Sequence, residues 1–292
     1  MSFTKKKITL IFTLGQGQFG QTGSNTVTVE GLRVSCQIVK TGSAAMSQAN
    51  IRIFGLTPTV YNSLASIYPV NLGIQRNTVT VQAGDDVNGI ATVFIGQITI
   101  AQIDLNSQPD SVMNIVAQTG LLQALTPIQP TSYPMGAAVA TAMQSLATQM
   151  NLNFENNNVT AILPKSYFPG TARQQALAIV EASGIKWNGG DDGVLAIWNN
   201  GSSRGGVIPI ISPDTGMIGY PSYSNIGIGV RTSYNPNIQY GGQIQLKSTL
   251  QVAHLNGNWQ VFGLTHMLES ELPDGQWMTE IQGFSIGAAN GQ

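Results

Sequence analysis

Apolar and polar residues alternate through much of the first 120 residues, as they do in strands that bury one face. Stretches such as ITLIFTL, TVTVEGLRVSCQIV and ATVFIGQITI are rich in β-branched residues, and Gly, Asn and Asp separate them, as in GDDVNG. This pattern predicts a β-sandwich or barrel. The expected strands lie at residues 6–14, 25–40, 49–55, 77–84, 90–105 and 111–118.

One segment of this β-rich part has helical spacing. In LTPTVYNSLASI, Thr57 is a candidate N-cap and Pro58 takes the first helical position. Val60, Leu64 and Ile67 then fall on one face. We expect a short helix here.

The middle of the chain changes period after a Pro-rich joint. Residues 135–151 predict a helix with an apolar stripe of Met135, Val139, Met143, Leu146 and Met150. So many methionines are also typical of an adaptable binding face, but core packing is the favoured interpretation.

A second helix is predicted at residues 171–184, with Thr171 as N-cap and Gly184 as the C-terminal stop. A strand at 152–156 precedes it, and a hairpin around GGDDG follows it. Two helices, a strand and a hairpin predict a small α/β domain.

Strand patterns return after NNGSSRGG. The expected strands lie at residues 207–211, 226–234, 241–248, 251–255, 258–270 and 276–286. The predicted fold is therefore mainly β with a smaller α/β part. Its expected domains are a β-domain at 1–124, an α/β domain at 125–204 and a second β-domain at 205–292.

Charge is scarce: 9% of residues are charged, against about 25% in a typical soluble domain, and the net charge is −1. Burial of much of the surface in a permanent assembly explains this, because charge is costly to desolvate. An extracellular protein with a polar, uncharged surface explains it equally well.

Several classes of function are disfavoured. The run at residues 5–7 is the only cluster of like charge, so no basic patch for nucleic acid is expected. The uncharged stretch between Asp110 and Glu155 is interrupted by Pro and Gln, so we expect no membrane insertion. ITLIFTL is interpreted as a strand and not as a signal peptide. A protein made and kept in a cytosol, until something else moves it, is expected.

Candidate catalytic chemistry is sparse. His254 and His266 are the only histidines, and a metal site from His266, Glu269 and Glu271 is disfavoured because positions 266 and 269 of a strand face opposite sides. Cys36 is interpreted as a small buried hydrophobic residue. The two Asp-Asp turns lack the closing Glu of a calcium loop. We expect no catalytic, cofactor-binding or metal residues, and no cofactor.

The aromatic residues allow two interpretations. Tryptophans could line a sugar-binding cleft, but these are scattered over two predicted domains and lie in strands, which favours packing in a core or an interface. They are Trp187, Trp198, Trp259 and Trp277.

Longer stretches of the sequence resemble a known family. VSCQIVKTGSAAMSQANIRIFGLTPTVYNSLAS, VTVQAGDD with ATVFIGQI, FPGTARQQALAIVEASGIKW, PDTGMIGYPSY and NWQVFGLTHMLESELPDGQWMT follow one another as in small baseplate hub proteins of contractile-tailed bacteriophages. The resemblance covers about residues 25–285.

This resemblance implies a structural, non-enzymatic virion protein with two tail-tube-like β-domains flanking the α/β domain. It implies a homotrimer that joins the hexameric tail tube to the trimeric central spike and contacts other baseplate components. DNA would pass through its bore without specific binding, and the particle would be assembled in the host cytoplasm. The open alternatives are a hub of a contractile secretion or bacteriocin particle, and a tail-tip glycan-binding or cell-wall-degrading protein.

Overall fold

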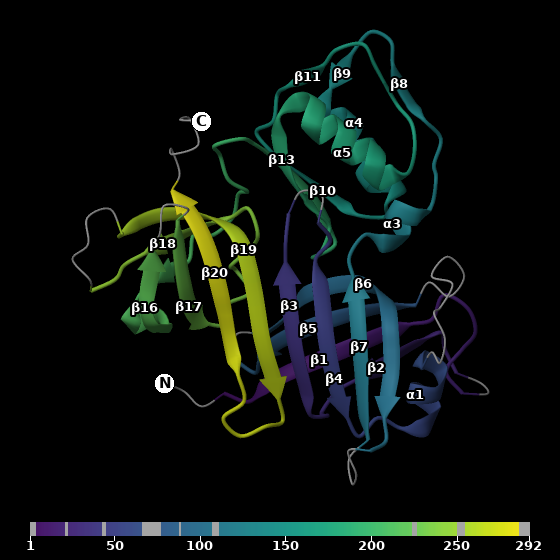
Figure 1. The fold of residues 1–292 in the computed structure, drawn as a ribbon, viewed down its shortest axis with the longest axis vertical. Helices are drawn as coiled ribbons and strands as arrows, with labels where there is room; N and C mark the ends of the chain where they lie inside the picture. Colours follow the sequence, from purple (N-terminus) through teal and green to yellow (C-terminus); the bar gives the residue numbers. More distant parts are fainter. Residues whose placement is uncertain are drawn as a thin grey trace. The chain divides into compact units, whose positions relative to one another are not determined.

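The computed structural model describes residues 4–20, 23–42, 45–65, 77–87, 89–106, 111–223, 227–249 and 255–285 (Figure 1). The chain forms two compact units. Unit 1 comprises Met1–Val39, Ser47–Leu122 and His266–Met278, and unit 2 comprises Lys40–Met46, Gln123–Thr265 and Thr279–Gln292. Each unit therefore combines segments that are distant in the sequence.

Unit 1 is built on an antiparallel sheet with the strand order β19-β3-β4-β7-β6-β5-β1-β2. Only the last residues of β19 belong to this unit. All six segments expected to form strands in this region do so. The bounds are β1 Lys6–Thr13, β2 Thr26–Val29, β3 Val34–Lys40, β4 Gln48–Phe54, β5 Thr78–Asp85, β6 Gly89–Asp104 and β7 Val112–Gln118.

Alternation along these strands places one set of side chains in the core of unit 1. In β4, Ala49, Ile51 and Ile53 are buried while the exposed Arg52 lies on the other face. The short helix α1, Pro58–Leu64, begins after Thr57 and buries Val60 and Leu64, as predicted. Ile67, the third residue of the expected apolar face, lies outside the described residues.

The α/β part of unit 2 contains the two predicted helices. Its helices are α3 Leu121–Leu125, α4 Val139–Gln149 and α5 Ala172–Ser183. Its strands are β8 Thr131–Tyr133, β9 Ala137–Ala138, β10 Asn153–Asn157, β11 Ile162–Leu163, β12 Ser166–Phe168, β13 Ile185–Gly189 and β14 Val194–Asn199. β14 pairs with β10 in parallel and with β13 in the predicted antiparallel hairpin.

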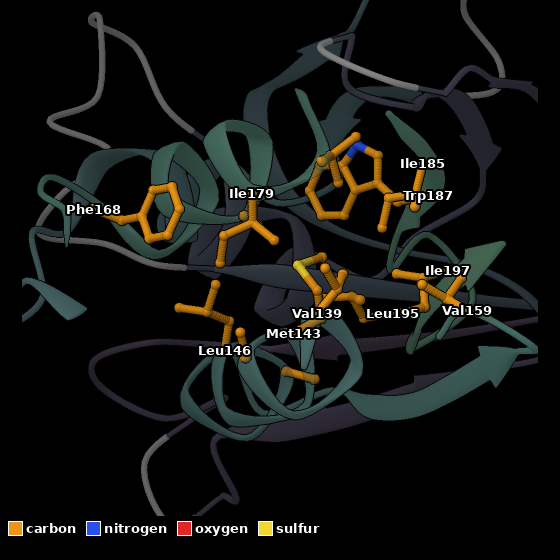
Figure 2. Close-up of a cluster of buried hydrophobic side chains, with 14 of the residues drawn as sticks. Val139, Met143, Leu146, Val159, Phe168, Ile179, Ile185, Trp187, Leu195 and Ile197 are labelled. Atoms are coloured by element: carbon orange, nitrogen blue, oxygen red, sulfur yellow. The ribbon is translucent and has the colours of Figure 1, made fainter. Parts of the chain in front are cut away.

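Apolar side chains from α4, α5 and this hairpin meet in one core (Figure 2). Met143 and Leu146 of α4 contribute to this core, with Ile179 of α5 and Leu195 of β14. The predicted apolar stripe is thus confirmed from Val139 onward, and core packing accounts for its methionines.

The prediction for Met135 was wrong, because its side chain is 95% exposed. Helix α4 begins only at Val139. Gly136 has a φ of 80°, and Ala137 and Ala138 then pair with β11 as a short strand. These pairings hold the chain extended before the helix can begin.

The C-terminal strands of unit 2 form a sheet in the order β16-β17-β20-β19, and β18 pairs with β19 and β15. Their bounds are β15 Ile210–Ile211, β16 Met217–Tyr223, β17 Ile228–Ser233, β18 Gln243–Leu246, β19 Gly257–Ser270 and β20 Trp277–Ser285. A second core lies among them, with Ile244, Leu246 and Val261 at its centre.

Most of the predicted strands in this region are confirmed, with two exceptions. The strand expected at 207–211 is reduced to two residues. Residues 251–254 of the strand expected at 251–255 lie outside the described residues, as does His254. Overall, strands make up 50% of the structure and helices 15%, so the mainly β prediction is confirmed.

Candidate functional site

The residues singled out for metal chemistry do not form a site. His266 is buried in β19, whereas Glu271 follows the strand and pairs with Lys5 at 2.8 Å. Glu269 instead accepts a hydrogen bond from the backbone N–H of Gln276 at 2.9 Å. Among the described residues, no group of three or more His, Cys, Asp and Glu side chains could hold a metal ion.

Cys36 lies in β3 and is fully enclosed by the core of unit 1. Burial raises the pKa of its thiol to about 12. The thiol is therefore protonated at neutral pH, and the predicted packing role is confirmed.

Trp187 and Trp198 are each only 2% exposed, so packing is also confirmed for these two tryptophans. Their indole nitrogens have no hydrogen-bond partner. A cavity of about 660 Å³ lies beside Trp198, with Tyr240, Phe262 and Phe284 in its wall. Because both tryptophans are enclosed, they present almost no ring surface to a sugar.

A buried guanidinium holds together the turn and strand ends of the α/β part. The Arg204 side chain is 3% exposed, and its Nη atoms lie 2.8 Å from Glu155 Oε2 and 2.8 Å from Asp192 Oδ2. Burial alone would lower the pKa of Arg204, but the two carboxylates raise it above its ordinary value. The side chain therefore stays charged and fixes β10 relative to the β13–β14 turn.

The loop between β3 and β4 is part of unit 2, although both strands lie mainly in unit 1. Lys40 Nζ lies 3.8 Å from Asp191 Oδ2 in a buried pair. Arg173 Nη2 donates to the carbonyl of Ala45 at 3.0 Å. A side chain at Gly42 would overlap the ring of Tyr240, which explains the small residue at this position.

Sequence reasoning did not predict this arrangement of the loop. The available signal was Lys40 itself. It stands at a buried position in the alternation of β3, and a lysine there needs a partner carboxylate.

Unit 2 contains an edge strand, β16, which pairs with β17 and has no other strand partner among the described residues. Its large side chains are exposed: Ile218 by 44%, Tyr220 by 72% and Tyr223 by 63%. The strand carries no charge. Pro221, which has no N–H to donate to a neighbouring strand, is a sign of an edge.

A shallow groove of about 370 Å³ runs across β16, β17 and β20. Ile218, Tyr220, Arg231 and Glu280 are among the residues that line it. Arg231 Nε donates to Glu280 Oε1 at 2.6 Å, so the charges that border the groove neutralise each other. The surface as a whole can bury apolar side chains at little desolvation cost.

Unit 1 also ends in an uncharged edge. β2 has the sequence TVTV and pairs with β1 alone among the described strands. Thr26 and Thr28 are exposed, while Val29 is buried. In the part of the chain that the structure covers, no helix is long and apolar enough to cross a membrane.

A sequence model of a protein family described as "Baseplate hub gp41" matches residues 8–279. The match spans both units and includes β2 and β16. No curated protein matches the sequence.

Solved structures of tail proteins have a similar fold. A tail protein from Neisseria meningitidis MC58 aligns with a TM-score of 0.62 at 10% identity, over 98% of each chain. The 43 kDa tail protein of prophage MuSo2 from Shewanella oneidensis aligns with a TM-score of 0.61 at 10% identity, over 96% of this chain and 97% of that chain.

A third structure comes from a secretion system. The E. coli c3393 protein, described as a type VI secretion component similar to the T4 tail proteins gp27 and gp5, aligns with a TM-score of 0.56 at 11% identity. The alignment covers 88% of this chain and 74% of that chain. At such identities these three likenesses establish the fold alone.

Proposed function

This chain belongs to the baseplate hub gp41 family, which makes it a structural protein of a phage tail baseplate and not an enzyme, and on that premise we propose that it works as a symmetry adaptor. Three copies form a ring with two tube-like β-domains in each. That ring joins the sixfold tail tube to the threefold central spike.

The observation that carries the proposal is the scarcity of charged residues in a chain that exposes large apolar side chains. The chain has 13 Lys and Arg and 14 Asp and Glu. Several of these residues form ion pairs within the chain, among them Lys5–Glu271, Lys40–Asp191 and Arg231–Glu280. For a baseplate protein, burial in a permanent assembly explains this scarcity better than an extracellular existence does.

The same scarcity supports passage of DNA through the bore of the ring. A bore lined with Lys and Arg would bind the phosphate backbone in a salt-dependent manner. A ring of chains with net charge −1 each binds no specific nucleic acid and lets DNA pass. The protein is assembled into the virion in the host cytoplasm, where it meets the tube, the spike and other baseplate components.

A hub of a contractile secretion or bacteriocin particle is the second candidate. The fold similarity to the E. coli secretion component favours it. Both candidates share the ring and the tube contact, and they differ in whether DNA passes through the bore.

The proposal is tested by measuring the mass of the protein in solution by light scattering. The measurement is made on the protein alone and after mixing with the spike and tube proteins of the same particle. We expect a trimer, either alone or only with the spike. A monodisperse monomer that ignores both partners would overturn the proposal. Clearing in a peptidoglycan zymogram would instead favour the cell-wall-degrading alternative.

A further inference from the structure

We propose that unit 2 binds an extended segment of another baseplate protein, which adds as a strand to the edge of β13 and inserts a large apolar side chain into the aromatic cavity beside it. The segment carries an acidic residue opposite Lys186. This inference rests on the proposed place of the protein in the baseplate, and it adds a binding site to the ring, tube and spike contacts.

The backbone of β13 has a free edge. β13 lies at one end of the three-stranded sheet β10-β14-β13, and β14 is its only strand partner among the described residues. At the other end of this sheet, β10 already holds a neighbouring segment, because Glu155 binds Arg204 and the Asn157 side chain accepts from the N–H of Gly205. An extended polypeptide can add to the free edge of β13 through main-chain hydrogen bonds.

The cavity beside Trp198 lies along this edge. Ile185, Lys186 and Trp187 of β13 contribute to its lining, and all of its lining residues belong to unit 2. Its volume of about 660 Å³ is that of a site that encloses a large group. Phe262 and Phe284 are only partly buried, and their ring centroids lie 5.4 Å apart. These two rings offer an apolar surface to an incoming side chain.

Buried polar groups in the lining favour a polypeptide as the occupant. The indole N–H groups of Trp187 and Trp198 are buried and have no hydrogen-bond partner among the described residues. Such donors are rare in native structures. Because a polypeptide carries a carbonyl at every residue, a segment bound in the cavity can supply acceptors that the described chain does not.

The charges of the lining select the chemistry of the segment. Glu181 and Lys186 are its charged residues, and both are exposed. Neither forms an ion pair within the part of the chain that the structure describes. An acidic residue directly opposite Lys186 on an added strand forms a favourable cross-strand pair. Glu181 in turn favours a basic residue on the same segment.

The register of the sheet fixes where the apolar side chain stands. Lys186 of β13 is opposite Trp198 of β14, so their side chains lie on the same face of the sheet. A residue opposite Lys186 on an added strand faces the same side, and so do the residues two positions away from it. The large apolar residue that enters the cavity therefore stands two positions from the acidic one.

Chemical labelling of lysines tests whether this site is occupied. The isolated protein and purified particles are acetylated briefly, and mass spectrometry measures the modified fraction of Lys186 and of Lys165, an exposed lysine that does not line the cavity. We expect Lys186 to react about tenfold more slowly in the particle than in the isolated protein, because a bound segment protects in proportion to its occupancy. Equal rates for Lys186 in both samples would overturn the inference.

A zero-length carbodiimide then identifies the occupant, because it joins an amine only to a carboxylate in direct contact. In the particle we expect Lys186 to be joined to an Asp or Glu of another baseplate protein, with a large apolar residue two positions away in that protein's sequence. Joining to a second copy of this chain would show a contact between copies. Protection of Lys186 without any joined carboxylate would show an occupant of different chemistry, and either result overturns the inference.

Charge reversal tests the same contact by affinity. Lys186→Glu should weaken binding of the identified partner about tenfold, because it places two like charges opposite each other, and reversal of the partner's acidic residue should restore binding. Lys165→Glu is the matched control, since it changes the net charge equally at an exposed site outside the cavity. Circular dichroism would verify that both variants are folded. Equal effects of the two variants would contradict the assignment of Lys186.

Light scattering on the same protein separates this inference from the proposed function. A trimer that binds spike and tube while Lys186 stays reactive in the particle overturns the β13 site alone. A monomer that ignores both partners overturns the proposed function.

Discussion

At the scale of single residues, Arg204 shows how a chain with few charges uses one of them. The guanidinium lies in the α/β part with carboxylates on two sides, from Glu155 and Asp192. Its hydrogen bonds replace those that it would make with water. Removing the guanidinium would leave two partly buried carboxylates without the positive charge that they pair with.

We therefore predict that Arg204→Met lowers the free energy of unfolding by about 3 kcal/mol, as expected when one partner of a buried pair is removed. Chemical denaturation followed by tryptophan fluorescence would measure the change. The matched control is Arg231→Met, which removes an exposed arginine from its pair with Glu280. It should cost less than about 1 kcal/mol, and equal losses in the two variants would contradict the prediction.

Cys36 makes stability depend on pH in the alkaline range. The ordinary pKa of the thiol is 9.0, and burial raises it to about 12 in the folded protein. The folded state thus holds its proton more tightly than the unfolded state. This contribution to stability is complete below pH 9 and is lost as the pH rises toward 12.

Between pH 8 and pH 10 the free energy of unfolding should fall by about 1 kcal/mol more in the parent protein than in the Cys36→Ala variant. Denaturation curves at a series of pH values would measure this difference. The variant has its own packing loss, so only the difference in slope is diagnostic. Parallel curves for the two proteins would show that the thiol is not enclosed.

At the scale of elements, the two helix N-caps differ although both residues are threonine. Thr171 Oγ1 accepts a hydrogen bond from the Gln174 N–H at 3.2 Å, and the Gln174 side chain accepts one from the Thr171 N–H at 2.9 Å. Thr57 stands at the same position before α1, but its side chain makes no capping bond.

Thr171→Ala should therefore lower the free energy of unfolding by about 1 kcal/mol, whereas Thr57→Ala should leave it almost unchanged. Both values can be read from urea denaturation. A loss at Thr57 that equals the loss at Thr171 would show that the capping bonds are not the cause.

The elements that sequence analysis could predict are those whose pattern is local. The strands of unit 1 and helix α5 follow from alternation and from cap residues that lie within their own segments. β16 could not be predicted in this way, because Gly219 and Pro221 interrupt the alternation in MIGYPSY. Its pairing with β17 also shifts register between Ile218 and Ser222. The short strands β8, β9, β11 and β12 are only two or three residues long and carry no periodic signal.

The candidate surface was predictable only in part. Scarcity of charge was compatible with burial in an assembly and equally with a polar extracellular surface, but which strand lies at an edge depends on the order of strands in the sheet. That order is set by pairing between distant segments, such as β1 with β5 at Leu10–Val81. The position of the loop that begins at Lys40 could not be predicted for the same reason. Asp191, which pairs with Lys40, lies about 150 residues further along the chain.

At the scale of the whole molecule, the units do not follow the order of the sequence, and this has a testable consequence for fragments. A fragment of residues 125–204 retains the complete core of the α/β part and the Arg204 cluster. A fragment of residues 1–124 lacks residues 266–278, which belong to unit 1. We expect the first fragment to fold and the second to remain largely unfolded.

Circular dichroism and the dispersion of amide proton resonances would distinguish these outcomes. The matched control joins residues 266–278 to the C-terminus of the 1–124 fragment through a flexible Gly-Ser linker, and this addition should restore the sheet. Folding of the 1–124 fragment by itself would show that its sheet does not need β19.

Because residues 266–278 return to unit 1, this unit can complete its sheet only late in the synthesis of the chain. As a ribosome makes the chain, β3 emerges early and pairs with β4, but its other neighbour, β19, is supplied only after more than two hundred further residues. Until then the N-terminal sheet keeps an open side. Pairing of so distant a segment is slow, and a chain that stops early never completes this sheet. Only a chain that extends through residues 266–278 can therefore complete unit 1. Truncated chains, which lack a complete unit 1, would not be incorporated into the assembling particle.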